Sequence, residues 1–374
     1  MEKDSENSAK LEKLAAPVPL EVPGVEGWKE VPLEENGEPL VAIGPFSGNS
    51  FDRIFTSSIY FGEREDSPYG RDTLHGALIT TFARREVAEQ VVEAEELLPN
   101  GRHIIVLDAY RTLEVQGSLY EQYLEALRSR EPQMSEEELS VETQKFVSIP
   151  SQDKTRPSPH NTGGAIDVAI YMLPGEINER VGQINARIQE IGNDINHAEE
   201  VYKLEMERIG LIAKNAQMLN FGTKWDHGGS EAALNYFEIL AQERDLTKDE
   251  EDARQNRRLL YNAMTGAGFE PYADEWWHYN SKKSQMGAKT ARIDRAEYGA
   301  MELSKDDWHH ELIRRQHLHG TERLTQMPIQ AMGKMGKQIA LLEVAAEAAQ
   351  KIGSMQQTSL PKAAIIAPPE KEAA

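Results

Sequence analysis

The sequence predicts an α+β fold, because helical and strand-like patterns alternate over short distances. Residues 82–98, FARREVAEQVVEAEELL, carry apolar side chains at helical spacing and end near a PNG turn. Residues 104–107 form an apolar run typical of a buried strand, and residues 165–172, AIDVAIYM, have the same strand-like character. We therefore expect a core that combines helices with strands.

Further segments continue this mixture on either side. Residues 117–130 carry another helical pattern. Residues 256–280, NRRLLYNAMTGAGFEPYADEWWHYN, indicate a helix, a glycine-rich turn and a strand. The 374 residues are enough to bury a full core.

The chain divides into three regions by composition. Residues 1–25 are polar and then proline-rich, which predicts a flexible N-terminal arm. Residues 26–303 contain the mixed patterns and are expected to form the domain. Residues 304–374 are expected to be a helical C-terminal extension that ends in a disordered tail, with an Ala- and Met-rich helix over residues 328–352.

A heptad pattern occupies an expected insertion at residues 176–218. Its apolar positions alternate at steps of four and three, at Ile177, Val181, Ile184, Ile188, Ile191, Ile195, Ala198 and Tyr202. This spacing predicts one long amphipathic helix that packs on the domain or pairs with a partner helix. The 177–202 and 328–352 helices are the candidates for homo-oligomer contacts.

Charge and composition restrict the function. The formal net charge of −21 repels nucleic acid and anionic membranes, so neither is an expected partner. The chain has no cysteine, so any metal must be held by His, Asp or Glu side chains. Neither a secretory signal nor a membrane span is visible, and we expect a cytoplasmic protein.

The stretch PSPHNTGGAID brings together residues suited to a metal site. His160 and Asp167 flank two glycines, which let the backbone turn back so that the two side chains converge. With His278 they form a set of two imidazoles and one carboxylate, which suits zinc and leaves a fourth position open. A histidine alone is more often a structural residue, so the joint pattern carries the prediction.

Other candidate residues lie near these three. Glu275 precedes His278 by three positions, and a regular strand would point the two side chains apart. We therefore expect a bend or a helical turn at residues 276–277. Arg111 ends a predicted strand, and Asp226 ends the segment NFGTKWD.

A second histidine cluster competes for the metal. It comprises His309, His310, His317 and His319, in DWHHELIRRQHLHG. This cluster has no obvious acid–base partner and no strand context. We interpret its members as surface residues.

Taken together, the motifs resemble those of the zinc D-alanyl-D-alanine dipeptidases, the family of the vancomycin-resistance dipeptidase. SPHNTGGAID fits the pattern S-x-H-x-x-G-x-A-x-D, EWWH fits E-x-W-H, and DAYR lies upstream in the expected order. The resemblance covers roughly residues 50–175 and 217–290. It implies the fold shared with D-Ala-D-Ala carboxypeptidases and the hedgehog signalling domain, with a small antiparallel sheet flanked by helices.

The resemblance implies a role for each matching residue. His160, Asp167 and His278 would bind one zinc ion per chain. Glu275 would be the general base that takes a proton from the attacking water and returns it to the leaving amine. Arg111 would hydrogen-bond the developing oxyanion.

Two further residues would contact the substrate. Asp226 matches the carboxylate near the free amino group, and Ser158 matches the serine of the motif as a supporting hydrogen-bonding residue. The sequence departs from the family where Thr112 replaces the usual proline. It also departs in the insertion at residues 176–218, which is expected beside the entrance.

The resemblance predicts hydrolysis of D-alanyl-D-alanine to two D-alanine molecules, in turnover of cell-wall (peptidoglycan) dipeptide or in glycopeptide resistance. The first alternative is a D,D-carboxypeptidase that trims muropeptides, and Asp226 argues against it because an extended peptide offers no ammonium there. The second is a non-catalytic binding protein that uses the heptad helix. The presence of Glu275 and all three ligands argues against this second alternative.

Overall fold

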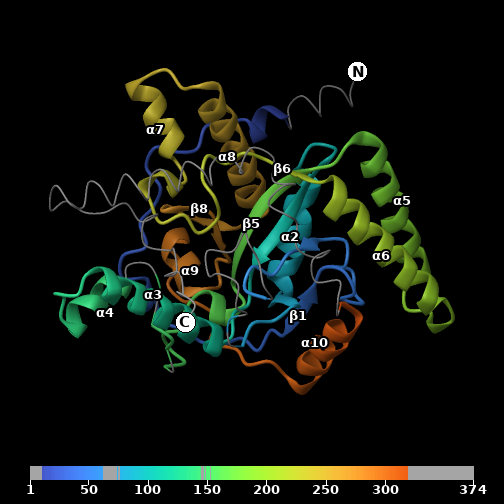
Figure 1. The fold of residues 1–374 in the computed structure, drawn as a ribbon, viewed down its shortest axis with the longest axis horizontal. Helices are drawn as coiled ribbons and strands as arrows, with labels where there is room; N and C mark the ends of the chain where they lie inside the picture. The colour runs from blue at the N-terminus through green and yellow to red at the C-terminus, as the bar shows by residue number, and fades with distance from the viewer. Residues whose placement is uncertain are drawn as a thin grey trace, which may run out of the picture.

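The computed structural model describes residues 11–61, 74, 76–144, 147, 149–151 and 153–318. The predicted α+β class is confirmed, since helices surround a small sheet whose central strand is β5 (Figure 1). The strands are β1 (Leu40–Ile43), β2 (Phe55–Thr56), β3 (Thr81–Arg84), β4 (Arg102–Asp108), β5 (Ala165–Met172), β6 (Gln217–Met218), β7 (Glu270–Tyr272) and β8 (Glu275–Asn280). The helices described at both ends are α2 (Arg85–Leu97), α3 (Leu113–Arg130), α4 (Glu136–Gln144), α5 (Gly175–Ile191), α6 (Ala198–Asn215), α7 (Tyr236–Glu243), α8 (Lys248–Gly266), α9 (Gln285–Ala291) and α10 (Lys305–Leu318).

The main sheet has the strand order β2-β4-β5-β8-β7, and β6 pairs with the far end of β5. Among the described strands, β2 and β4 are the one parallel pair, and the other pairs are antiparallel. A separate two-stranded sheet joins β1 to β3. Residues 82–84, which the sequence predicts as the start of a helix, belong to β3, whose residues 81–84 pair with β1.

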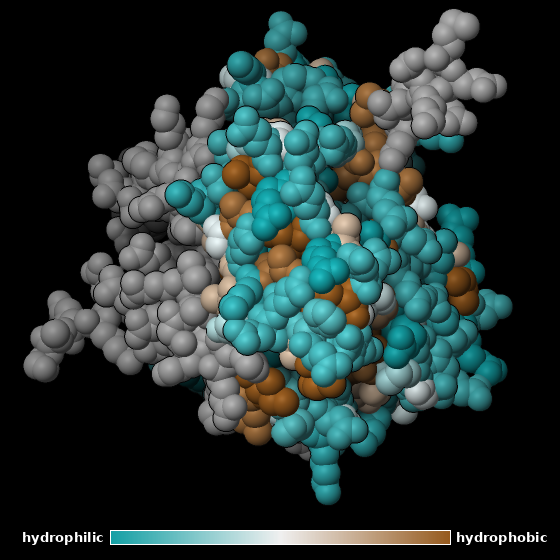
Figure 2. All heavy atoms as spheres, turned by 90° about the vertical axis from the view of Figure 1, so that its right-hand side faces the viewer, coloured by the Kyte–Doolittle hydropathy of each residue, from teal (hydrophilic) through white to brown (hydrophobic). Residues whose placement is uncertain are grey.

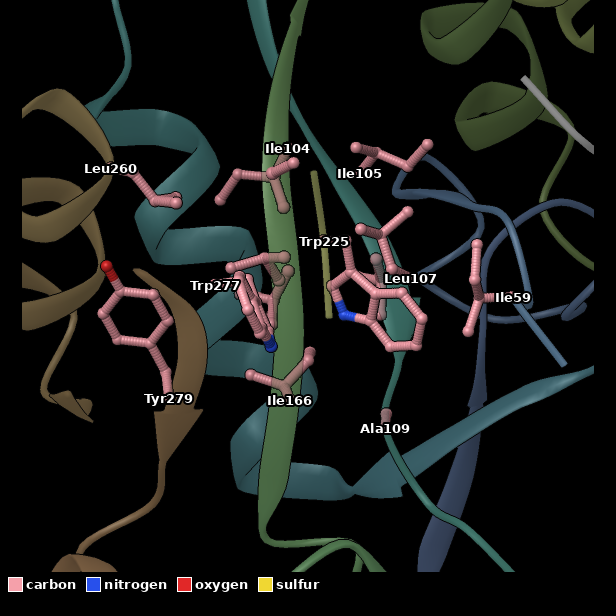
Figure 3. Close-up of a cluster of buried hydrophobic side chains, with 14 of the residues drawn as sticks. Ile59, Ile104, Ile105, Leu107, Ala109, Ile166, Trp225, Leu260, Trp277 and Tyr279 are labelled. Atoms are coloured by element: carbon pink, nitrogen blue, oxygen red, sulfur yellow. The ribbon is translucent and has the colours of Figure 1, made fainter. Parts of the chain in front are cut away.

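The core lies on both sides of β4 and β5. Ile104 and Leu107 are buried in β4, as the apolar run predicts, and Ile166 is buried in β5. Trp277 lies beside Ile166, and Leu260 extends from α8 toward the sheet (Figure 3). Helices α2 and α8 pack against each other and against the strands. This packing fixes the strand ends that carry the candidate site.

The predicted single helix over residues 177–202 is wrong. Helix α5 ends at Ile191, Gly192 follows with φ 58°, and α6 runs back beside α5 (Figure 1). Ile195, which would continue the heptad pattern, is 82% exposed in the turn. The apolar positions of α5 therefore pack against α6 of the same chain.

This α5–α6 hairpin lies away from the start of β5. It follows Met172, and Asp167 lies five residues earlier in the same strand, about 17 Å away at about 3.3 Å per residue. The face of the molecule on the hairpin side is mainly hydrophilic, with hydrophobic patches interrupted by hydrophilic side chains (Figure 2). A homo-oligomer contact through residues 177–202 stays a prediction.

The described part of the predicted N-terminal arm is packed against the domain. Leu14 and Val18 are 5% and 2% exposed and belong to the main hydrophobic cluster. The amide of Asn262 in α8 donates to the carbonyl of Ala16 at 2.8 Å. Residues 11–25 are therefore part of the folded structure, because a few apolar side chains and backbone hydrogen bonds attach them to α8.

The C-terminal extension begins with α10, which packs near β1 and β3 through buried charged groups. The Glu311 carboxylate accepts hydrogen bonds from the backbone of Ile79 and Thr80 at 3.0 and 2.9 Å. The predicted 328–352 helix lies outside the described residues. Among the helices that are described, none is long and apolar enough to cross a membrane.

Candidate metal centre and active-site cleft

Three polar side chains lie in a row across the main sheet. Asp108 of β4 is opposite Asp167 of β5, and Asp167 is opposite His278 of β8. Directly opposed residues of antiparallel strands have Cβ atoms about 4.5–5.5 Å apart. This register brings Asp167 and His278 together, although 111 positions separate them in the sequence.

His160 reaches the same point from the turn before β5. It begins the short helix η2 (His160–Thr162), which ends at Gly163 in a left-handed conformation with φ 68°. Residues with a side chain rarely adopt this conformation, so glycine is needed for the reversal. The turn that the sequence predicts is present, and it places Nε2 of His160 3.5 Å from Oδ1 of Asp167.

The three ligand atoms are close enough to share one metal ion. Nδ1 of His278 lies 3.0 Å from Oδ1 of Asp167 and 3.2 Å from Nε2 of His160. In a tetrahedral site with bonds of about 2.0–2.1 Å, ligand atoms lie about 3.3 Å apart. The spacing of these residues therefore fits a tetrahedral metal centre with three protein ligands and one open position.

Both histidines are oriented by their second ring nitrogen. Nδ1 of His160 donates to the carbonyl of Ala109 at 2.8 Å, and a carbonyl can only accept. Nε2 of His278 lies 3.3 Å from the side-chain oxygen of Asn280. With these nitrogens protonated, the neutral rings point lone pairs at the shared position, which is the tautomer that metal binding requires.

The carboxylate of Asp167 is held in the same way. Its second oxygen, Oδ2, accepts a hydrogen bond from Nε1 of Trp225 at 3.2 Å. Burial acts to raise the pKa of Asp167, but attraction to His160 and hydrogen bonds from both histidines hold this pKa below its ordinary value. A metal ion would take the place of the two imidazole protons in these hydrogen bonds, so that two imidazole lone pairs and an ionised carboxylate would face it in a buried place.

Glu275 lies at the first position of β8, beside the predicted ligands. Its Oε2 is 3.8 Å from Nδ1 of His278, and its side chain is 32% exposed. Neither the bend nor the helical turn predicted at residues 276–277 is present, because residues 275–280 form a continuous strand. The irregularity is instead a shift in the pairing of β7 with β8, between Pro271 and Tyr272, and Tyr272 pairs with Glu275.

Arg111 is fixed by a network of buried partners. Nε and Nη2 donate to Oδ2 of Asp108 at 3.1 and 2.6 Å, Nη1 donates to Gln116 at 3.0 Å, and Nη2 donates to the Tyr60 hydroxyl at 2.9 Å. Burial acts to lower the pKa of Arg111, but Tyr60 and Asp108 raise it above its ordinary value. The guanidinium therefore stays charged and held in one orientation.

The predicted site residues share one cleft with a volume of about 220 Å³. None of the described residues of α5 or α6 lines this cleft, so the expectation that the insertion lies beside the entrance is wrong. All seven side chains predicted from the sequence line it: Arg111, Ser158, His160, Asp167, Asp226, Glu275 and His278.

Asp226 and Ser158 both line the cleft wall. Asp226 has φ 60°, a conformation that Asp tolerates better than most residues with a side chain. It follows Trp225, whose ring contacts Tyr60 at a centroid distance of 5.7 Å. Ser158 is buried, and its carbonyl accepts a hydrogen bond from the amide of Asn161 at 3.0 Å.

A buried cation holds the loop that carries Asp226. The Arg257 guanidinium of α8 donates to the carbonyls of Phe221, Glu231 and Ala233 at 2.9, 2.7 and 2.5 Å. Arg257 is 1% exposed, and burial lowers its pKa to about 9. One side chain thus satisfies three loop carbonyls and fixes the loop against α8.

The second histidine cluster is only partly described. His309 is exposed on α10 and His310 is half-buried, whereas the side chains of His317 and His319 lie outside the described residues. The prediction that these histidines are surface residues is thus tested only for His309 and His310. It agrees with the exposed His309 and only in part with the half-buried His310.

The sequence did not predict four residues that support the site: Tyr60, Asp108, Trp225 and Asn280. Asp108 carried a local signal, since it precedes Arg111 by three positions in the DAYR motif. The other three contact the site through tertiary packing, and no local spacing indicates them.

Comparison with known proteins supports a peptidase. A family model described as D-ala-D-ala dipeptidase matches residues 236–294, which include Glu275 and His278. A D-alanyl-D-alanine dipeptidase from Synechocystis sp. is 20% identical over 258 residues, which cover 67% of this chain and 84% of that protein. Both matches support the resemblance of this chain to the D-alanyl-D-alanine dipeptidases.

Proposed function

We propose that the protein is a zinc-dependent dipeptidase that hydrolyses D-alanyl-D-alanine to two D-alanine molecules. The observation that carries this proposal is the convergence of His160, Asp167 and His278 beside Glu275 in one cleft. Two imidazoles and a carboxylate with an open fourth position suit catalytic zinc. Turnover of cell-wall dipeptide and removal of the glycopeptide target are the two physiological roles consistent with this reaction.

The bound ion would supply Lewis-acid activation of the attacking water and of the substrate carbonyl. Glu275, beside the ligands and partly exposed, accepts the proton of the attacking water and passes it to the leaving amine. Arg111, fixed by Asp108, donates to the oxygen that becomes negatively charged. The buried partners of Arg111 hold it in place before the substrate binds.

The hydrogen bonds of Arg111 support one contact with the reacting oxygen. A guanidinium has five N–H donors, and the bonds to Asp108, Gln116 and Tyr60 use four of them. One donor, on Nη1, remains for the substrate. A single donor suits an oxyanion better than a two-point grip on a carboxylate.

Replacing Arg111 by Ala is expected to lower kcat by about 10²–10³-fold and to change KM much less, because the contact forms in the transition state. Steady-state kinetics on D-Ala-D-Ala measure this. Arg128→Ala, an exposed arginine on α3, is the matched control. A change confined to KM would mark Arg111 as an anchor for the substrate carboxylate instead.

Asp226 is proposed to bind the substrate ammonium. Asp226 directly follows Trp225, whose ring contacts Tyr60 at a centroid distance of 5.7 Å, so residue 226 lies on the Tyr60 side of the cleft. A substrate without its ammonium would desolvate this carboxylate without supplying the positive charge that it is proposed to bind. Such a loss costs about 3–5 kcal/mol.

N-acetyl-D-Ala-D-Ala is therefore expected to be a very poor substrate of the wild type. Asp226→Ala should lower kcat/KM for D-Ala-D-Ala more than kcat/KM for N-acetyl-D-Ala-D-Ala. The difference between the two substrates should therefore be smaller than in the wild type. Asp194→Ala, on the turn of the α5–α6 hairpin, is the control and should keep the wild-type preference. Equal cleavage of both compounds by the wild type would favour the D,D-carboxypeptidase alternative.

One assay tests the proposed function directly. Zinc-loaded protein is incubated with D-Ala-D-Ala, L-Ala-L-Ala and a muropeptide that ends in D-Ala-D-Ala, and released alanine is measured. Release from the free D,D-dipeptide alone supports the proposal. Release from the muropeptide alone supports the carboxypeptidase, and release from none of the three supports a binding protein.

A further inference from the structure

The N-terminal segment is fastened on one side of the cleft. The carbonyl of Leu20 accepts a hydrogen bond from the side-chain amide of Asn235 at 2.6 Å, just before α7. The amide of Val18 donates to Oε1 of Glu238 in α7 at 3.3 Å. Leu14 and Val18 are also buried, so the segment is held in place before it reaches the cleft.

The same segment is fastened again beyond the cleft. Nε2 of Gln285 in α9 donates to the carbonyl of Val31 at 2.7 Å, directly after the short helix η1 (Trp28–Glu30). Glu35 then pairs with buried Arg84, whose Nε donates to the carbonyl of Thr162 at 2.7 Å. Thr162 belongs to the turn that carries His160, so this attachment reaches the candidate metal centre itself.

Between the two attachments, residues 21–30 form what we call the strap. Val25 and Trp28 of the strap are half-buried and line the cleft. The amide of Trp28 donates to the carbonyl of Val25 at 2.9 Å, and Gly27 has φ 71°. This compact turn holds the Trp28 ring at the cleft wall.

The strap and Asp226 lie on opposite flanks of the metal ligands. The ligands Asp167 and His278 lie on β5 and β8, near the middle of the order β2-β4-β5-β8-β7. Tyr60, which follows β2, contacts Trp225 beside Asp226 on one flank. Helix α9, on which η1 packs, contacts β7 and β8 on the other flank.

We propose that the strap is a fixed wall on the leaving-group side of the cleft and that Trp28 limits the substrate to a dipeptide. The inference rests on the proposed function and on Asp226 as the site of the ammonium. A residue added at the carboxyl end would meet the Trp28 ring. Its peptide group would also lie beside Val25 and Met286, which offer no strong side-chain hydrogen bond, and beside Trp28, whose one donor is the indole N–H.

The experiment compares D-Ala-D-Ala with D-Ala-D-Ala-D-Ser, which keeps the free ammonium. Release of D-Ala-D-Ser from the tripeptide is followed by mass spectrometry at early times. For the Trp28→Ala protein, we expect the ratio of kcat/KM for tripeptide to dipeptide to rise at least about tenfold, the usual scale of steric discrimination in an apolar pocket. Val25→Gly should raise the ratio in the same direction.

Two control variants and the metal content complete the test. Trp28→Phe keeps a ring at the wall, and Trp308→Ala removes a tryptophan that is 44% exposed on α10; both should keep the wild-type ratio. An unchanged ratio in both Trp28→Ala and Val25→Gly, with dipeptide hydrolysis and metal content intact, would overturn the strap proposal alone. A wild type that hydrolyses no dipeptide would overturn the proposed function as well.

Discussion

A His278→Ala protein is expected to contain no stoichiometric zinc and to hydrolyse no D-Ala-D-Ala. The remaining two ligand atoms, from His160 and Asp167, cannot form a site with three protein ligands. Elemental analysis after dialysis measures the metal, and circular dichroism checks the fold. His197→Ala is the matched control, because this histidine is 45% exposed on the α5–α6 turn and pairs with Asp194.

Replacing Asn280 is expected to weaken zinc binding without abolishing it. Its side-chain oxygen lies 3.3 Å from Nε2 of His278 and orients the ring without touching the metal position. Loss of such a partner typically lowers metal affinity about 10–100-fold, so Asn280→Ala should bind zinc more weakly but still stoichiometrically at high zinc. Full zinc in dialysed His278→Ala protein would contradict the assignment of the ligands.

The site was predictable from sequence to the extent that its residues lie in short motifs. The glycines between His160 and Asp167 indicate a reversal, and Gly163 makes it with φ 68°. The partnership of Asp167 with His278 depends on strand register across 111 positions, which no spacing reveals. The resemblance to a family supplied that pairing, and the geometry agrees with it.

The α5–α6 hairpin shows why the heptad pattern was misleading. Apolar side chains at steps of three and four describe one face of a helix, whether its partner is another chain or the same chain turning back. The turn depends on Gly192, with φ 58°, and on the two residues after it. The heptad pattern does not predict this turn, because Ile195 stands at the expected spacing although its side chain is exposed to solvent.

The strap was missed for a different reason. A proline-rich segment with few apolar residues has the composition of a disordered arm. Its order comes from long-range contacts, such as the burial of Val18 and the bond from Gln285 to Val31. The buried arginines Arg84 and Arg257 are similar cases, because arginine is rarely fully buried and its carbonyl partners are distant in sequence.

A Glu275→Gln protein is expected to keep its metal and its fold while kcat falls by about 10²–10⁴-fold, the usual contribution of a general acid–base group. Glutamine has nearly the same shape as glutamate, but its amide cannot accept the proton of the attacking water.

The neighbouring Asp274 supplies the control for this prediction. It lines the same cleft on the same turn, and its carboxylate accepts a hydrogen bond from the Tyr272 hydroxyl at 3.0 Å. Asp274→Asn changes the charge of the cleft by the same amount without touching the proposed base, so it should lower kcat far less. Steady-state kinetics at matched zinc content separate the two variants. A near wild-type rate for Glu275→Gln would reduce Glu275 to a residue that orients the substrate, and equal losses in both variants would assign the effect to the cleft's negative charge.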